Sequence, residues 1–162
     1  MKYLNKFNEA KVYVSKTFVT VDAVVIKEST DEILLIKRKN EPFKDHWALP
    51  GGFLDENEDL EVAARRELME ETQVEVSSMR QIGAFGKPNR DPRSHNISVA
   101  YFATVGEETN PIASDDAKEV KWFSIYELPQ LAFDHGDIIK EGLERYYNMS
   151  WNEFTRTKKT IN

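Results

Sequence analysis

The 162-residue sequence contains no cysteine. Disulfide bonds, thiolate zinc sites and cysteine nucleophiles are therefore excluded, and any metal ion must be held by oxygen or imidazole ligands. The sequence also has no long apolar run, so it predicts neither the hydrophobic core of a signal peptide nor a membrane span. We expect a cytoplasmic protein.

Positive charge is in the minority. The chain has 22 Lys and Arg against 28 Asp and Glu, which gives a formal net charge of -6. This charge repels nucleic acid and anionic membrane, so we expect neither as a partner. It also repels a small phosphorylated ligand, and a protein of this kind that handles phosphates needs bound divalent cations to reverse the local field.

The order of predicted elements indicates one mixed α/β domain over residues 1–162, with a basic tail from about 148 to 162. The rhythm of strand, helix and parallel strand that marks a doubly wound fold is missing, which favours a sandwich with helices on both faces of a mixed sheet. Strands are predicted at 17–28 and 33–39 (a hairpin), 79–87, 97–105 and 119–124, helices at 57–72 and 134–148, and a turn of helix at 126–130.

The predicted helix at 57–72 has two different faces. Its acidic face carries Glu67, Glu70 and Glu71, whose separations of three and four residues place them together. Three like charges repel one another, an arrangement that makes sense when a divalent cation lies between the carboxylates. The neighbouring Arg66 is expected to pair with Glu70 or Glu58 and hold the acids in position.

Other residues complete this helix. Asp55 or Asn57 is expected to cap its beginning. The face opposite the glutamates is small and apolar enough to lie close on a sheet, and it consists of Leu60, Ala63, Ala64 and Leu68. One face of the helix therefore packs while the other is free to bind a metal ion.

The stretch from Gly52 to Val74 resembles the Nudix box, G-x5-E-x7-R-E-U-x-E-E-x-G-U with U aliphatic. The matching residues are Gly52, Glu58, Arg66, Glu67, Leu68, Glu70, Glu71 and Val74. One position departs from the pattern, because Gln73 stands where the family has a glycine. Glycine there permits a left-handed helix end, so Gln73 must adopt an unfavourable φ or end the helix differently.

The resemblance to the Nudix family implies an α/β/α sandwich that hydrolyses a nucleoside diphosphate linked to another group, using Mg²⁺ or Mn²⁺. It implies Glu67 and Glu71 as the principal metal ligands, with a carbonyl near Gly51 or Gly52 completing the shell. Glu70 would be an additional ligand or would orient a metal-bound water. Family members often take the general base from a loop before a late strand. The candidates there are Asp115, Asp116 and Glu119, and Glu70 is the alternative.

Outside the box, three further stretches are notable: RKNEPFKDHWALPGGF leading into the box, GKPNRDPRSHNISVAYFA after it, and the later LAFDH. In these stretches the sequence is similar to the ADP-ribose pyrophosphatase branch of the family, whose reaction gives AMP and ribose 5-phosphate. Pro88 fits a proline placement associated with that substrate. Arg90 and Arg93 are candidate donors to the diphosphate or ribose, Arg38 is a further phosphate candidate, and Phe85 is a candidate for stacking on adenine.

Three alternatives to ADP-ribose as the substrate remain open within the family: another nucleotide sugar, a dinucleotide and a nucleoside triphosphate. A different class of function is a non-catalytic sensor or regulator that binds an ADP-ribose-like ligand. The sensor reading is the weaker one, because such relatives often lose box carboxylates and this chain retains them all. Relatives of this branch are commonly homodimers, so a homodimer is expected by analogy.

Overall fold

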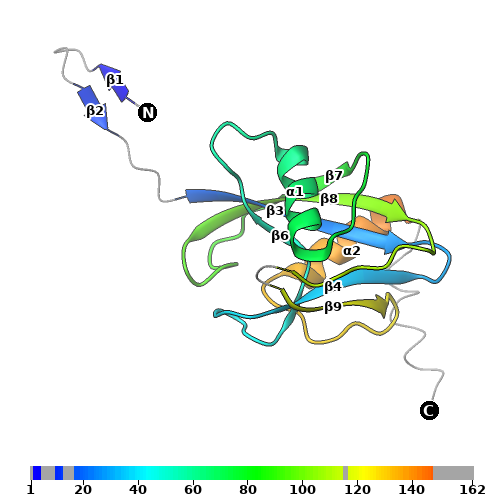
Figure 1. Ribbon diagram of the computed structural model, residues 1–162. Helices are drawn as coiled ribbons and strands as arrows, with labels where there is room; N and C mark the ends of the chain where they lie inside the picture. Colours follow the sequence, from blue (N-terminus) through cyan, green and yellow to red (C-terminus); the bar gives the residue numbers. More distant parts are fainter. Residues whose placement is uncertain (1, 5–9, 13–16, 115–116, 148–162) are drawn as a thin grey trace.

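The computed structural model describes residues 2–4, 10–12, 17–114 and 117–147 (Figure 1). The strands are β1 (Lys2–Leu4), β2 (Ala10–Val12), β3 (Thr17–Lys27), β4 (Glu32–Arg38), β5 (Trp47–Ala48), β6 (Gly51–Phe53), β7 (Arg80–Phe85), β8 (His95–Val105) and β9 (Ala117–Ser124). The helices are α1 (Leu60–Thr72) and α2 (His135–Tyr146). The expected tail at 148–162 lies outside the described residues.

Seven strands form one mixed sheet, in which β5, β4, β3, β8 and β7 lie side by side, β6 pairs with β3, and β9 pairs with β4. Strands β3 and β8 run parallel along their whole length, from Thr17 opposite His95 to Lys27 opposite Val105. The other pairs in this sheet are antiparallel, including the predicted hairpin of β3 and β4. The predicted mixed sheet is confirmed.

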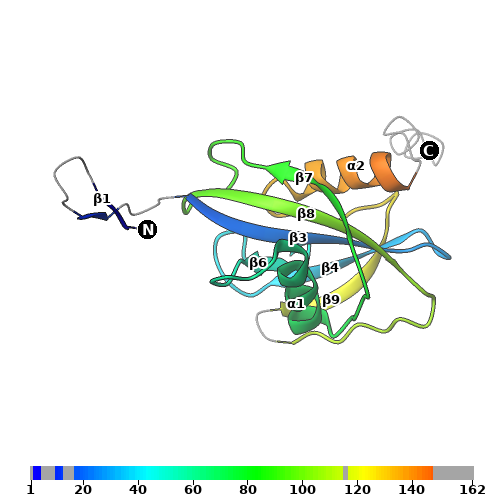
Figure 2. The same cartoon turned by 90° about the horizontal axis from the view of Figure 1, so that it is seen from above.

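The two helices cover opposite faces of this sheet, as Figure 2 shows with α2 above the strands and α1 below them. The side chains of β3 explain the arrangement, because successive residues of a strand point to opposite faces. Val21, Ala23 and Val25 pack in the cluster that contains α1, whereas Val24 and Ile26 pack in the cluster that contains α2. The expected α/β/α sandwich is therefore correct.

Helix α1 begins later than the sequence suggested. Asp59 is its N-cap, and its carboxylate accepts hydrogen bonds from the backbone N–H groups of Glu61 and Val62. The expected caps were wrong, since Asp55 lies in the preceding turn, where its backbone N–H donates to the Glu58 carboxylate, and Asn57 has a left-handed φ of 62°. The chain must complete this turn before the helix can start.

Two further predictions concern helix ends and turns. Gln73 ends α1 with a left-handed φ of 57°, and its N–H donates to the Met69 carbonyl, so it takes the unfavourable conformation instead of avoiding it. Residues 126–130 do not form a turn of helix. The chain makes a single tight turn there, closed by a hydrogen bond from Glu127 N–H to the Ser124 carbonyl.

Neither helix in the described part of the chain is long and apolar enough to cross a bilayer.

Candidate active site

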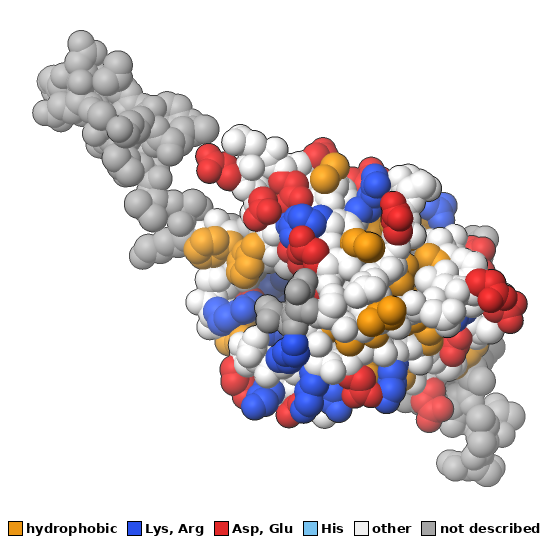
Figure 3. Space-filling view, viewed as in Figure 1, with side chains coloured by type: hydrophobic (Ala, Val, Ile, Leu, Met, Phe, Trp, Pro, Cys, Tyr) orange, Lys and Arg blue, Asp and Glu red, His pale blue; other side chains and the backbone are white. Residues whose placement is uncertain are grey.

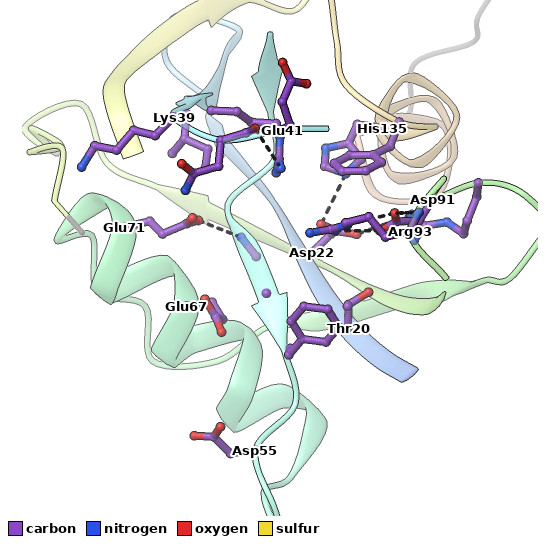
Figure 4. A pocket seen from close by; sticks show the side chains of 18 residues that line it. Thr20, Asp22, Lys39, Glu41, Asp55, Glu67, Glu71, Asp91, Arg93 and His135 are labelled. Carbon is purple, nitrogen blue, oxygen red and sulfur yellow. Dashed lines mark hydrogen bonds and ion pairs between the residues drawn. The ribbon is translucent and has the colours of Figure 1, made fainter. Parts of the chain in front are cut away.

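A pocket of about 380 Å³ opens beside β6. Figure 4 shows Glu67 and Glu71 projecting from α1 on one side of β6, and Asp22, Asp91, Arg93 and His135 on the other. The second side also includes Arg38 at the end of β4, whose guanidinium lies over the Phe133 ring, and residues of the loop between β7 and β8. We call the first side the helix wall and the second the loop wall.

Arg66 organises the helix wall. Its Nε and Nη2 donate to the two carboxylate oxygens of Glu58 at 2.8 and 2.9 Å, and Nη1 donates to Glu67 at 2.9 Å and to Glu70 at 3.0 Å. Nη2 also donates to the Phe53 carbonyl at 3.1 Å, which ties α1 to β6. The sequence predicted Glu70 or Glu58 as the partner of Arg66, and in the structure Arg66 donates to both carboxylates. In Figure 3, acidic side chains surround basic ones over α1.

Glu71 is the most buried carboxylate of the helix wall, at 8% exposure. It accepts a hydrogen bond from the Gly51 N–H at 2.9 Å. Burial raises its pKa to about 8, the Gly51 hydrogen bond opposes that rise, and the negative charges of Glu67 and Asp22 add to it. The positive charge of Arg38 also opposes the rise, but burial outweighs it, so the carboxylate charge of Glu71 is only partly balanced.

Glu67 lies one helical turn before Glu71 and faces the same pocket. Burial raises its pKa, and the hydrogen bond from Arg66 works against that rise. Its carboxylate rests against Gly52, where an added Cβ would lie only 2.4 Å from Oε1 of Glu67. Glycine at position 52 therefore leaves room for the Glu67 carboxylate next to the backbone of β6.

Glu70 differs from the other two glutamates because it is exposed and its carboxylate is held by Arg66. Within the described ranges, no three acidic or histidine side chains converge into a metal-binding group. The helix wall thus presents two carboxylates, Glu67 and Glu71, to the pocket. Mg²⁺ is commonly held by one or two carboxylates together with substrate phosphates and water, so this donor set fits such an ion.

On the loop wall, the sequence analysis missed a buried polar group centred on Asp22 of β3. Asp22 is 7% exposed and accepts a hydrogen bond from the Ser98 hydroxyl. Its Oδ1 lies 3.6 Å from Nε2 of His135. The Leu49 N–H donates to Nδ1 of His135 at 2.9 Å, which places the ring hydrogen on Nε2, toward Asp22. Burial lowers the pKa of His135 and keeps its ring neutral.

The predicted arginines occupy different settings on the loop wall. Arg90 is 5% exposed at its side chain, and its Nε and Nη2 donate to Asp134 at 2.9 and 2.6 Å. Arg93 forms a similar two-point pair with Asp91, at 3.0 and 2.7 Å. Arg38 instead donates from Nε to the Pro42 carbonyl at 2.9 Å. All three arginines line the pocket.

Other predicted residues lie elsewhere. Phe85 packs against the core under α2, and Pro88 is exposed in the turn closed by Arg90 N–H and the Lys87 carbonyl. Glu119 lies on β9, where its carboxylate pairs with Lys37 and Lys121. None of Phe85, Pro88 and Glu119 is among the described residues that line the pocket. Asp115 and Asp116 lie outside the described residues.

Sequence signals for the missed residues are uneven. Asp22 is the one charged residue between Thr17 and Ile26 in an otherwise apolar or hydroxylated strand, which marks it as unusual in a buried position. For Phe133 and His135, the only sequence signal was a short motif of aromatic and polar residues before a predicted helix. Their place in the pocket depends on contacts between segments that are distant in the chain.

Comparisons with known proteins agree on one protein family. Residues 16–142 match a family model described as NUDIX domain. The sequence is 47% identical over 124 residues to the ADP-ribose pyrophosphatase of Methanocaldococcus jannaschii, covering 76% of this chain and 71% of that protein. It is 32% identical over 136 residues to the ADPR responsive transcriptional repressor NtrR of Acinetobacter baylyi, covering 80% of this chain and 54% of the repressor.

Among solved structures, the NUDIX domain of Shewanella oneidensis NrtR complexed with ADP ribose matches with a TM-score of 0.74 and 34% sequence identity. That match covers 82% of this chain and 90% of the solved one. This chain therefore matches most of an isolated domain and of a pyrophosphatase, but only about half of the full-length repressor.

Proposed function

This chain belongs to the Nudix family, and we propose that it hydrolyses the diphosphate of ADP-ribose to give AMP and ribose 5-phosphate. The observation that carries this proposal is the pocket with two opposed walls, one bearing the carboxylates of the half-buried Glu67 and the buried Glu71 and the other bearing arginines. Similarity to a named ADP-ribose pyrophosphatase supports the choice of substrate.

Glu67 and Glu71 are the residues that would hold Mg²⁺ or Mn²⁺. A backbone carbonyl of Gly51 or Gly52 is the proposed additional ligand, and Glu70 would orient a metal-bound water. When bound, the cation supplies neutralising charge for the diphosphate and lowers the pKa of the attacking water. The raised pKa values of Glu67 and Glu71 support this assignment, because a nearby cation would stabilise both carboxylates in the charged form.

The other proposed roles, which are positioning and binding, belong to arginine side chains around the diphosphate. Arg66 keeps Glu67 in place through its hydrogen bond of 2.9 Å, which fixes one carboxylate before substrate arrives. Arg38 and Arg93 are the proposed donors that bind the phosphate oxygens of the substrate before the chemical step. Arg90 is the proposed support for this wall, because its side chain is 5% exposed and pairs with Asp134, whereas the side chain of Arg93 is 45% exposed.

The general base remains a proposal among Glu70, Asp116 and Glu119. Glu119 is engaged by Lys37 and Lys121, and the pKa of its carboxyl is lowered by these lysines, Lys121 most of all, so it is a weak proton acceptor. We therefore propose Glu70, which lies on the same helix as the proposed ligands. Replacing Glu70 with Gln should lower kcat with little change in KM, because a base acts in the chemical step, and an unchanged kcat would reject it.

The test of the reaction is a substrate panel. The protein should be incubated with Mg²⁺ and ADP-ribose, NADH, a UDP-sugar or a nucleoside triphosphate, and the products separated by chromatography. We expect AMP and ribose 5-phosphate from ADP-ribose, with the highest kcat/KM of the panel. A higher kcat/KM for another member would assign the enzyme to that substrate and reject ADP-ribose.

A sensor function is the second candidate, because a repressor that responds to ADPR is among the similar proteins. A sensor would bind ADP-ribose and release no AMP. Calorimetric binding combined with product analysis separates the two functions, since binding without turnover in the presence of Mg²⁺ or Mn²⁺ would reject the hydrolase.

We further propose that the protein acts in the cytoplasm as a homodimer. An exposed apolar pair supports the dimer: Phe18 and Phe53 are 48% and 47% exposed, and their rings meet edge to face with 6.0 Å between centroids. Light scattering after gel filtration should give twice the chain mass, and Phe18→Ser should reduce it. Ile112→Ser, at an exposed site away from this pair, is the control.

A further inference from the structure

Phe133 has an unusual backbone for an aromatic residue. Its φ of 51° lies in the left-handed region, which costs an L-residue about 1–2 kcal/mol. It stands between the fully buried Ala132 and Asp134, whose carboxylate holds Arg90. Such a conformation persists when its surroundings determine it, and it is found most often where a side chain has a particular place to fill.

The ring of Phe133 has a packed side and a side that lines the pocket. Phe43 meets it edge to face at 4.8 Å between ring centroids, and the His135 ring lies 5.3 Å away. The same ring is approached by two guanidinium groups, with the central carbon of Arg38 at 4.9 Å and that of Arg93 at 5.8 Å from the ring centroid. The ring therefore contacts two cations that come from separate segments.

The two arginines differ in how their charge is balanced. Arg93 has the carboxylate of Asp91 as a two-point partner. Arg38 donates to the backbone carbonyls of Pro42, from Nε, and of Asn40, from Nη2, and among the described residues it forms no ion pair with a carboxylate. A half-buried guanidinium without a carboxylate partner, next to a second guanidinium, favours a site for an anion.

We propose that Phe133 is a positioning residue that holds the guanidinium groups of Arg38 and Arg93 for one diphosphate group, and so sets the affinity for diphosphate-bearing substrates. The aromatic face attracts both cations through its quadrupole, and the Pro42 carbonyl fixes the Nε of Arg38 beside it. The proposal rests on the proposed hydrolysis of a diphosphate. It predicts an effect on KM, because the arginines are placed before the chemical step.

The first test replaces Phe133 with Leu, which removes the aromatic face and keeps an apolar residue with the same left-handed backbone cost. We expect KM for ADP-ribose to rise roughly fivefold to tenfold, with kcat within about twofold. Phe133→Tyr retains the ring face and should restore the original KM. Phe123→Leu, which removes a ring that packs on Trp47 away from the pocket, is the stability-matched control and should leave KM unchanged.

An unchanged KM in Phe133→Leu, or a fall in kcat with constant KM, would overturn the proposal. A rise in KM that Phe133→Tyr fails to reverse would also overturn it, since the ring face would then not be the cause. Thermal melting of each variant separates these outcomes from unfolding.

A second test does not depend on turnover of ADP-ribose. Nε–Hε resonances of the arginine side chains can be followed by NMR during addition of inorganic pyrophosphate with Mg²⁺, and assigned with Arg38→Lys and Arg93→Lys. We expect both resonances to shift in the original protein and to shift less in Phe133→Leu. If ADP-ribose is not hydrolysed but these shifts occur, the proposed substrate is rejected and the proposed role of Phe133 is supported. If neither resonance moves, the role of Phe133 is rejected.

Discussion

The helix wall and the loop wall of the pocket differ in how far apart in the sequence their residues lie. The helix wall is one continuous stretch, in which Arg66, Glu67 and Glu71 occupy adjacent turns of α1. The loop wall joins Asp22 of β3, Arg38 at the end of β4, the loop containing Arg93, and Phe133 before α2. A helix dictates the first arrangement by its own period, whereas only the packed sheet creates the second.

The two walls also satisfy their charges differently. On the helix wall, Arg66 donates hydrogen bonds to Glu58, Glu67 and Glu70, so one guanidinium group pairs with three carboxylates. On the loop wall, Arg90 and Arg93 each hold a separate carboxylate. We conclude that the carboxylates of the helix wall outnumber its positive charges, which suits a metal cation. The loop wall instead carries arginine donors, which suit an anion.

The largest effect is expected on the helix wall. Glu71→Gln removes the charge of a proposed metal ligand while preserving its shape and its ability to accept from the Gly51 N–H. We expect kcat for ADP-ribose to fall by roughly 10²–10³-fold, with the circular dichroism spectrum unchanged. The exposed Glu75 lies just beyond α1, and Glu75→Gln is the control. Activity retained within a few-fold in Glu71→Gln would mean that the helix wall is not where the chemistry occurs.

A second effect tests whether one arginine supports the whole helix wall. Arg66→Ala leaves the carboxylates of Glu58 and Glu67 without their strongest donor, and we expect the free energy of unfolding to fall by about 1–3 kcal/mol. The neighbouring Arg65 has a buried Nε without a hydrogen-bond partner among the described residues, so Arg65→Ala is the matched control. Urea denaturation measures both, and equal losses would show that Arg66 has no special structural role.

The same contrast explains what could be predicted from the sequence. The strands and helices were located because their residues alternate or repeat with regular periods, as in β3 and α1. The glutamate cluster was found because residues separated by three or four positions share a helical face. The pair of Arg66 and Glu70 was predicted for the same reason, whereas the bonds from Arg66 to Glu58 and to the Phe53 carbonyl reach outside the helix.

The loop wall could be predicted only in part. Arg38 and Arg93 were identified by chemical type, and both line the pocket, but their shared contact with Phe133 depends on three segments meeting. Phe85 and Pro88 were selected by chemical type or position, and they lie outside the pocket lining. Asp22 was missed because strand periodicity identifies which residues are buried and gives no indication of which buried polar residue faces a ligand site.

A smaller effect concerns the loop wall and depends on pH. Burial lowers the pKa of His135 below its ordinary value of 6.5, with Arg90 and Arg38 adding to the decrease and Asp22 and Asp134 opposing it. The unfolded chain therefore binds a proton at this residue more readily than the folded chain does. Stability from neutral His135 is present above about pH 6.5 and is lost as the pH falls below it.

His135→Gln keeps a hydrogen-bond acceptor for the Leu49 N–H and removes the titrating ring. We expect the melting temperature of the original protein to fall between pH 7.5 and 5.5 by more than that of the variant. Thermal melts across this range in low-salt buffer measure the difference. Parallel pH dependence in the two proteins would show that protonation of His135 does not contribute to stability.

The smallest expected effect tests how far local rules govern the helix wall. Gln73 ends α1 at a φ of 57°, where a side chain costs about 1 kcal/mol relative to glycine. Gln73→Gly should raise the free energy of unfolding by about that amount, because glycine adopts this conformation without the contact between Cβ and the backbone. Gln73→Ala retains the Cβ and should give no gain. Equal unfolding energies for the Gly and Ala variants in urea would mean that contacts of the Gln73 side chain, and not its backbone, determine how α1 ends. The helix wall would then depend on tertiary contacts in the same way as the loop wall.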